Sequence, residues 1–270
     1  MGLLRLTVKN ALEHLAPGWM AQRYLRRIET ATLAEKEISL LPLLCRADSL
    51  AIDVGANQGL YVHHLLPLVS QVIAFEPLPR MQAQLQRFYA GKIRLEPVAL
   101  SRAPGRAQLR MPAGNPSWAT MAQTNQLELA QPDKPIETVD AEVRTLDSYE
   151  LHNISLIKID VEGNEEAVLE GAAATLARER PNLVIEVEER HNAGSVLRVA
   201  RFLGNLSYDG FYLLDGALKP ISSFDAAHDQ DIHNVGLQGK VGRYINNFIY
   251  VPRERVGTLL SACHPGADLQ

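Results

Sequence analysis

Short, continuous apolar runs alternate with longer stretches of helical periodicity from residue 49 onward. The runs are SLAIDV, QVIAFE, IRLEPVAL, SLIKIDV, NLVIEVE, GFYLL and NNFIYVP. Runs rich in Ile, Val and Leu without polar alternation are typical of strands covered on both faces, and connections of helix length make such strands parallel. The pattern therefore predicts an α/β fold with a doubly wound, mostly parallel, seven-stranded sheet and helices on both faces.

The first 48 residues follow a different pattern, and we interpret residues 1–48 as an N-terminal helical arm. Apolar residues recur at helical spacing, Pro17-Gly18 interrupts them, and a second amphipathic stretch follows. The first apolar stripe consists of Leu3, Leu4, Leu6, Val8, Leu12 and Leu15. Basic residues recur along the arm, and such charges are usually the solvated face of a packing helix. Peripheral contact of residues 1–30 with an anionic membrane is the alternative.

We interpret the remaining chain as one domain over residues 49–255 and a C-terminal tail over residues 256–270. Residues 102–147 interrupt the alternation of strands and helices, because prolines and glycines are frequent there. We expect an insertion with one or two short strands and a substrate loop around PAGNPSWATM, since loops on a rigid scaffold carry binding groups.

Composition narrows the class of protein. Hydrophobic residues make up 46% of the 270 residues and charged residues 21%, which is typical of a folded domain. The net charge of −4 gives no general attraction to phosphate backbones, so we expect a small-molecule substrate and no nucleic acid. Cys45 and Cys263 lack disulfide or zinc-ligand spacing, and no apolar run approaches the roughly 20 residues of a membrane span. A cytoplasmic location is the simplest interpretation.

The stretch AIDVGANQGLY joins the first buried strand to a helix through a loop with two glycines. Asp53 lies at the strand end, and Gly55, Ala56, Asn57 and Gly59 belong to the loop. A dinucleotide-binding fingerprint would have a glycine where Asn57 stands. A carboxylate repels a pyrophosphate and attracts a sulfonium group, so Asp53 favours the cationic nucleoside S-adenosylmethionine over NAD.

The second strand ends in AFEP, which places Glu76 and Pro77 at the same edge of the sheet. An acidic side chain in this position accepts hydrogen bonds from both hydroxyls of a ribose. The alternative is a glutamate that caps the turn before Pro77. In combination with Asp53, the position favours a cofactor-binding role for Glu76.

A second group of acidic residues follows the strand LIKID. Asp160 is at the end of this strand, which we expect beside the first strand, with Glu162 shortly after it and Glu186 at the end of the next strand. Carboxylates that converge in a cleft raise one another's pKa, so one can act as general base for a hydroxyl, or the group can hold a divalent cation. We predict Asp160 as the base, with Glu162 or Glu186 assisting, and assign no residue to a metal.

Several neighbours of these residues have simpler interpretations. Glu165 and Glu166 begin a helix, where carboxylates stabilise the helix dipole. Lys158 lies on the same face of the strand as Asp160 and is expected to pair with a carboxylate. Three histidines are weaker candidates for the base, namely His63, His64 and His191.

Taken in order, these motifs resemble the FkbM family of S-adenosylmethionine-dependent methyltransferases over about residues 35–252. The motifs are IDVGANQGLY, AFEP, VALS, RTLDS, LIKIDVEGNEEAVLEGA, RPNLVIEVEE and NNFIYVP. The resemblance implies a class I methyltransferase fold, which is Rossmann-like, with residues 49–255 as the cofactor-binding domain. It also implies O-methylation of a hydroxyl on a sugar, a glycolipid or a related natural product.

The same resemblance implies roles for individual residues. The residues at the family's cofactor positions are Asp53, Gly55, Asn57, Gly59 and Glu76, and those of its acidic motif near the reaction centre are Asp160 and Glu162. We expect Asp160 to border both the cofactor and the acceptor. After VALS the family commonly has an acidic residue, whereas this chain has Arg102. Ser101 and backbone amides are therefore expected to contact the adenine.

Two other functions stay open at this point. An NAD(P)-dependent oxidoreductase has the same kind of scaffold, but it needs phosphate-binding glycines and a tyrosine or lysine proton donor at set spacing, which we do not find. A non-catalytic cofactor-binding module would keep the fold without turnover. The presence of Asp53, Glu76 and Asp160 argues against such a module, because buried carboxylates are costly to keep.

Overall fold

The computed structural model of the protein describes residues 17–130, 132–236, 239–240 and 242–263. The apolar stripe predicted over residues 3–15 lies outside these residues.

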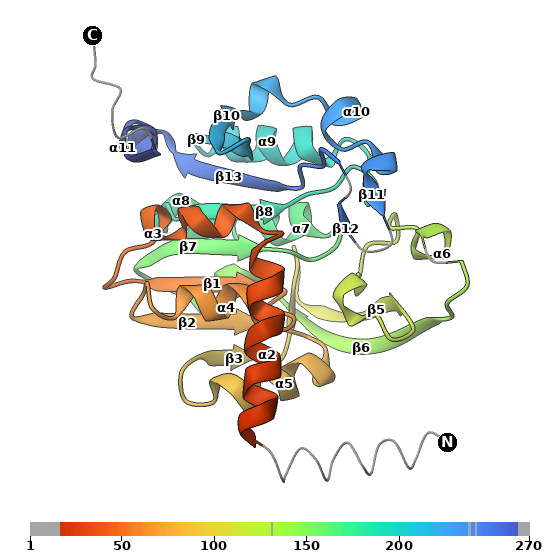
Figure 1. Cartoon of the computed structure of the whole chain (residues 1–270). Helices are drawn as coiled ribbons and strands as arrows, with labels where there is room; N and C mark the ends of the chain where they lie inside the picture. Colours follow the sequence, from red (N-terminus) through yellow and green to blue (C-terminus); the bar gives the residue numbers. More distant parts are fainter. Residues whose placement is uncertain (1–16, 131, 237–238, 241, 264–270) are drawn as a thin grey trace, which may run out of the picture.

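An eight-stranded sheet forms the centre of the molecule, in the order β10-β9-β13-β8-β7-β1-β2-β3 (Figure 1). Its strands are β1 (Leu50–Val54), β2 (Gln71–Phe75), β3 (Arg94–Glu96), β7 (Ile154–Ile159), β8 (Asn182–Glu186), β9 (Tyr208–Leu214), β10 (Ala217–Pro220) and β13 (Asn247–Pro252). The five strands from β8 to β3 are parallel, whereas β13 runs antiparallel to both β8 and β9. The strand order reverses at β1, so the carboxyl ends of β1, β2 and β7 form the edge where such sheets bind ligands.

The predicted doubly wound, mostly parallel sheet is confirmed, but it has one strand more than the seven predicted. β10 pairs with β9 through the two-residue turn Asp215-Gly216, in which both residues have a positive φ (50° and 79°). These angles are typical of a type I′ hairpin. β10 is short and partly exposed, so it lacks the apolar run by which the other strands were found.

A second, three-stranded sheet lies beside the carboxyl ends of β1, β2 and β7 (Figure 1). It consists of β4 (Ala99–Leu100), β5 (Gly105–Pro112) and β6 (Ile136–Arg144), in the order β4-β6-β5. The predicted single strand IRLEPVAL is therefore two strands, β3 and β4, in two different sheets. The segment predicted as an insertion supplies β5 and β6, and its Leu109 and Met111 pack against Leu78 and Met81.

Helices cover both faces of the main sheet. One face is covered by α7 (Glu165–Glu170), α8 (Ala173–Glu179) and α9 (Ser195–Asn205), and the other by α2 (Pro17–Thr32), α3 (Leu41–Leu44), α4 (Leu60–Leu65), α5 (Pro79–Tyr89) and α11 (Val256–Cys263). Two short helices, α6 (Leu127–Ala130) and α10 (Ala226–Asp229), and a two-stranded ribbon, β11 (Val235–Gly236) with β12 (Gly239–Lys240), lie in the loops. The 3-10 turns are η1 (Lys36–Leu40), η2 (Pro116–Trp118), η3 (Leu146–Tyr149), η4 (Ile221–Ser223), η5 (Ile232–Asn234) and η6 (Arg253–Arg255).

The described part of the N-terminal arm packs against the main domain. Tyr24 and Ile28 of α2 are buried, and Tyr24 stacks on Phe88 with 3.8 Å between ring centroids. The Tyr24 hydroxyl donates a hydrogen bond to the carbonyl of Gln58 at 2.7 Å. At the other end of the chain, the first half of the predicted tail forms α11, which buries Leu259. None of the helices in the described ranges is long and apolar enough to cross a bilayer.

Candidate active site

Strand alternation brings a carboxylate and a lysine to the same face of the sheet. In β1, Ala51 belongs to the core under α2 and α4, and Asp53 points the same way because side chains alternate along a strand. In β7, Leu156 belongs to that core, and Lys158 shares its direction. Asp53 and Lys158 are register partners across the two strands. The carboxyl ends of β1 and β7 therefore present opposite charges side by side beneath α2.

The loop after β1 passes very close to the end of β7. Gly55 has a φ of +81°, and a Cβ added there would lie 1.9 Å from the carbonyl oxygen of Asp160. Asn57 also has a positive φ (46°), which asparagine adopts more readily than most residues. At Gly59 (φ +84°) a Cβ would lie 2.8 Å from the Tyr89 ring. Glycine at both positions is therefore required by contacts to neighbouring elements as well as by backbone conformation.

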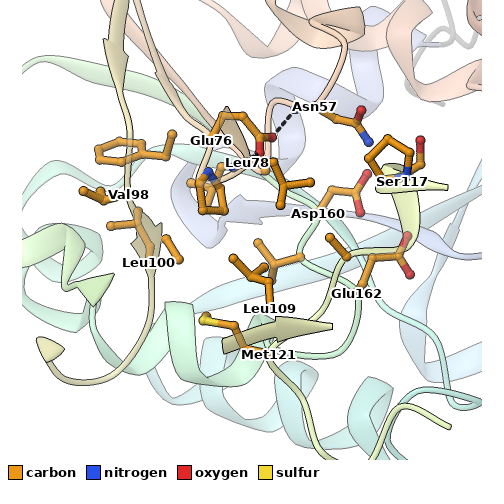
Figure 2. A pocket seen from close by; sticks show the side chains of 18 residues that line it. Asn57, Glu76, Leu78, Val98, Leu100, Leu109, Ser117, Met121, Asp160 and Glu162 are labelled. Carbon is orange, nitrogen blue, oxygen red and sulfur yellow. Dashed lines mark hydrogen bonds between the residues drawn. The ribbon is translucent and has the colours of Figure 1, made fainter. Parts of the chain in front are cut away.

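Two cavities meet at this loop. The first lies between the end of β2 and the second sheet (Figure 2). Its walls are mostly apolar, with Val54, Gly55, Phe75, Pro77, Leu78, Val98, Ala99, Leu100, Leu109, Pro116, Ala119, Met121 and Val161, and its polar residues are Asn57, Glu76, Ser117, Asp160 and Glu162. An apolar pocket with a few convergent polar groups is typical of small-molecule and cofactor sites.

The second cavity has a volume of about 200 Å³ and lies between α2 and the loop. Its lining contains more polar and charged residues and includes Arg27, Ile28, Ala31, Glu35, Asp53, Ala56, Gln58, Leu60, Tyr61 and Lys158. Four residues line both cavities, namely Gly55, Asn57, Ser117 and Asp160. The two cavities are therefore parts of one site.

Glu76 is a buried acidic residue in the wall of the first cavity. Its carboxylate accepts hydrogen bonds from the backbone N–H of Asn57 at 2.7 Å and from that of Leu78 at 2.8 Å. The side chain is 4% exposed, and burial raises the pKa of Glu76 to about 7 although both hydrogen bonds act in the opposite direction. A carboxylate has about four acceptor positions, so Glu76 can still accept hydrogen bonds from a ligand.

Asp53 is buried without a full set of partners. It is 2% exposed, and its Oδ2 atom has no hydrogen-bond partner. Burial raises the pKa of Asp53 to about 7, while the charge of Lys158 acts to lower it. An unsatisfied buried carboxylate oxygen costs free energy, so this atom is a position where a ligand's donor group would be stabilised.

Lys158 is the buried cation of the site, with 1% of its surface exposed. Its Nζ atom lies 3.3 Å from Oδ1 of Asn247, 3.9 Å from Oδ2 of Asp160 and 4.9 Å from the centroid of the Tyr61 ring. Burial alone would lower the pKa of Lys158, but Asp160 and other carboxylates nearby raise it above its usual value. The lysine therefore stays charged, and its expected pairing with a carboxylate is observed.

Asp160 lies where the two cavities join. Its backbone N–H donates to the carbonyl of Val54 at 3.0 Å, which fixes the end of β7 against β1. Burial raises the pKa of the Asp160 carboxyl, while the charge of Lys158 acts to lower it. Glu186, at the end of β8, accepts a hydrogen bond from Nδ2 of Asn246 at 2.6 Å and lines neither cavity. Asp160 thus faces the site, and Glu186 stands behind it.

Glu162 reaches the first cavity from a strained backbone. Its φ is 55°, and its carbonyl accepts hydrogen bonds from Oγ1 of Thr120 at 2.6 Å and Nδ2 of Asn125 at 3.0 Å. Its carboxylate lies 3.3 Å from Nε2 of His191. His191 is 4% exposed, and burial lowers its pKa to about 4. The segment between β5 and β6 therefore holds the Glu162 backbone in place.

Several predicted residues lie outside the cavity walls. Ser101 uses its backbone N–H to bond the carbonyl of Arg144, and the residues just before it, 98–100, line the first cavity instead. Gly59 packs against the side chains of Tyr89, Leu85 and Tyr24. Oγ1 of Thr32 lies 2.8 Å from Nε2 of His64, a contact between α2 and α4, and His63 lies on the same helix α4. Ser117 lines both cavities and comes from the loop predicted to contact substrate.

Among the described residues, Glu162, Glu188 and His191 bring possible metal-ligand atoms within 4.8 Å of one another. Glu188, however, already accepts hydrogen bonds from the Arg190 guanidinium at 2.5 and 2.9 Å and from the Tyr244 hydroxyl. The Arg190 side chain and His191 hold the pKa of Glu188 at about 2 against the effect of burial. This arrangement is a satisfied ion pair, and we assign no metal to it.

Sequence comparison relates the chain to known methyltransferases. Residues 53–210 match the Methyltransferase FkbM domain. A curated relative, the 2-O-methyltransferase NoeI of Sinorhizobium fredii, is 29% identical over 156 residues, which are 52% of this chain and 64% of that protein. The chain thus covers less than two thirds of this relative's length.

Two solved structures align with most of this chain at low sequence identity. The FkbM methyltransferase of Methylobacillus flagellatus has a TM-score of 0.49 and 15% identity over 76% of this chain and 43% of that chain. An rRNA methylase of Streptococcus thermophilus has a TM-score of 0.44 and 11% identity over 80% of this chain and 94% of that chain. The domain match, which covers more than half of the chain, assigns the protein to the FkbM methyltransferase family, with S-adenosylmethionine as its cofactor.

Proposed function

We propose that the protein transfers the methyl group of S-adenosylmethionine to a hydroxyl group of a sugar, a glycolipid or a related natural product. The observation that carries this proposal is the position of Asp160, a carboxylate that lines both cavities at their junction. The name of the NoeI relative, a 2-O-methyltransferase, supports oxygen as the methylated atom. The family assignment supports methyl transfer over the oxidoreductase and the non-catalytic module.

The cavities fit the cofactor in three respects. Glu76 offers a carboxylate in an apolar pocket, as a ribose requires, and the adenine would lie among residues 98–100 and Leu78. Asp53 has an unsatisfied oxygen for a cationic group. Gly55 lacks a side chain where the backbone forms the wall between the cavities. When bound, S-adenosylmethionine supplies an electrophilic methyl group on a sulfonium.

The chain's own contribution to the reaction is alignment and proton removal. A hydroxyl that is methylated must lose its proton, and we propose that Asp160 accepts it, with Glu162 orienting the acceptor. A raised pKa suits a general base, because the group then holds the proton more readily near neutral pH. Glu186, behind Asp160, is proposed as a positioning residue. The acceptor is proposed to be a small molecule or glycan in the cytoplasm, consistent with the free thiols of Cys45 and Cys263.

Asp160→Asn is expected to lower kcat about 100- to 10,000-fold, because a general base typically contributes a rate factor of this size. The affinity for S-adenosylhomocysteine should stay within about threefold of the wild type. The assay follows transfer of a tritiated methyl group from S-adenosylmethionine to a panel of glycans and glycolipids. Asp140→Asn, the same change at an exposed position on β6, is the control and should be neutral. Full turnover by Asp160→Asn would remove the residue from its role as base, and mass spectrometry showing a methyl group on nitrogen or carbon would contradict O-methylation.

Cofactor affinity is expected to rise with pH between about pH 5.5 and 8. Asp53 and Glu76, each with a pKa of about 7, must be ionised to accept a ligand's donors. Calorimetry with S-adenosylhomocysteine should show affinity at least about tenfold weaker at pH 5.5 than at pH 8. Because these carboxyls bind protons more tightly when folded, their contribution to the stability of the free protein is present below about pH 4 and is lost as the pH rises toward 7. A flat affinity profile would show that neither carboxylate binds the cofactor.

A further inference from the structure

The second cavity is lined by a part of the chain that precedes the family domain. Arg27, Ile28 and Ala31 are on α2, whereas the domain match begins at residue 53. Positions 27 and 31, and 28 and 31, are neighbours on a helix surface, so α2 presents one continuous side to the cavity. The position of α2 is fixed by hydrogen bonds from Tyr24 to Gln58 and between Tyr24 and Tyr89, each 2.7 Å long.

The two cavities offer a continuous path for one extended ligand. Asn57, Ser117 and Asp160 line both, and Figure 2 shows these three side chains at one side of the first cavity. S-adenosylmethionine carries its adenosine and its amino acid on opposite sides of the sulfur. If the adenosine lies in the apolar first cavity, the amino-acid end extends past these residues into the second.

The charges of the second cavity suit a zwitterion. Lys158 is already engaged with Asn247 and Asp160, and Glu35 accepts a hydrogen bond from Nδ2 of Asn247 at 2.6 Å. Two charged groups remain for a ligand, beside Oδ1 of Asn57 and the hydroxyl of Tyr61, which are uncharged and also lack a hydrogen-bond partner. One is the unsatisfied Oδ2 of buried Asp53. The other is the Arg27 guanidinium, which has no ion-pair partner within the described residues and stands on the opposite wall, on α2.

We propose that this cavity binds the amino-acid end of S-adenosylmethionine, with Asp53 accepting from the ammonium group and Arg27 pairing with the carboxylate. The inference rests on the proposed function, in that it takes the first cavity as the adenosine site. It assigns a cofactor-binding role to the N-terminal arm, which leaves the acceptor to enter beside Asp160 and Glu162. An arginine is well suited to the carboxylate because its planar guanidinium donates two parallel hydrogen bonds.

Three ligands differ in how much of the cofactor's amino-acid end they carry. S-adenosylhomocysteine carries the complete amino-acid end, decarboxylated S-adenosylmethionine keeps the ammonium group without the carboxylate, and 5′-methylthioadenosine lacks both. Arg27→Met removes the guanidinium and keeps an unbranched stem for packing, and Arg26→Met is the matched control on the same helix. Calorimetry measures the affinity of each variant for each ligand.

Arg27→Met is expected to lower the affinity for S-adenosylhomocysteine about tenfold and to change the affinity for the other two ligands by less than about twofold. Arg26→Met should leave all three affinities unchanged. Unchanged affinity for S-adenosylhomocysteine in Arg27→Met would overturn the inference, as would equal weakening of all three ligands. Asp53→Asn should weaken the two ligands with an ammonium group and spare 5′-methylthioadenosine. If the wild-type protein binds none of the three, the proposed function itself fails.

Discussion

Glu76→Ala is expected to lower the affinity for S-adenosylhomocysteine at least about 100-fold. The carboxylate is the polar group of the apolar cavity at the end of β2, and hydrogen bonds from two ribose hydroxyls to a charged acceptor contribute about 1.5–3 kcal/mol each. Their loss corresponds to two or more powers of ten in affinity. The substitution also leaves the N–H groups of Asn57 and Leu78 without their acceptor, which loosens the glycine loop. Calorimetry at neutral pH measures the effect.

Glu96→Ala is the matched control for this prediction. Glu96 ends β3, the strand next to β2, and pairs with Arg94 at 2.7 Å on the surface. It lines neither cavity, so its removal should leave the affinity within about twofold. Circular dichroism of both variants establishes that they are folded at the assay temperature. Binding by Glu76→Ala within threefold of the wild type would show that the ribose lies elsewhere.

The candidate residues that the structure brings together at the cavities follow from one geometric rule. Asp53, Glu76 and Asp160 each stand at the carboxyl end of a buried parallel strand, and parallel strands bring such ends to one edge of the sheet. The loop residues Gly55 and Asn57 follow directly from the strand before them. Local pattern and sheet topology are enough to place these five residues, although their roles in binding and catalysis are predictions still to be measured.

The positions of other residues relative to the cavities depend on contacts between distant segments. Ser101 was expected at the adenine, but β4 leaves the main sheet to pair with β6, and the chain turns residues 98–100 into the cavity instead. Arg27 is exposed, as expected for the basic residues of the arm, and it also lines the second cavity. Its position over the loop depends on Tyr24, which bonds to Tyr89 across 65 positions in sequence. No periodicity within either segment encodes such a contact.

Gly55→Ala is expected to destabilise the protein by about 4 kcal/mol or more. Its φ of +81° costs a side chain about 1–2 kcal/mol by itself. The larger part comes from the new Cβ, which would lie 1.9 Å from the Asp160 carbonyl oxygen. That oxygen belongs to backbone and cannot rotate away, and a shift of β7 would strain the hydrogen bond between the N–H of Asp160 and the carbonyl of Val54. Urea denaturation monitored by circular dichroism measures the loss.

Gly91→Ala is the control that separates the cost of the steric contact from the cost of the positive φ. Gly91 also has a positive φ (+73°), and a Cβ there would meet no atom within 4 Å, so this variant should lose only about 1–2 kcal/mol. Equal losses of stability in the two variants would mean that the end of β7 moves away from the new Cβ at no cost in free energy. A much larger loss at Gly55 would show that the backbones of β1 and β7 must meet without a side chain between them. That close approach is what allows Asp53 and Asp160, from different strands, to line a single cavity.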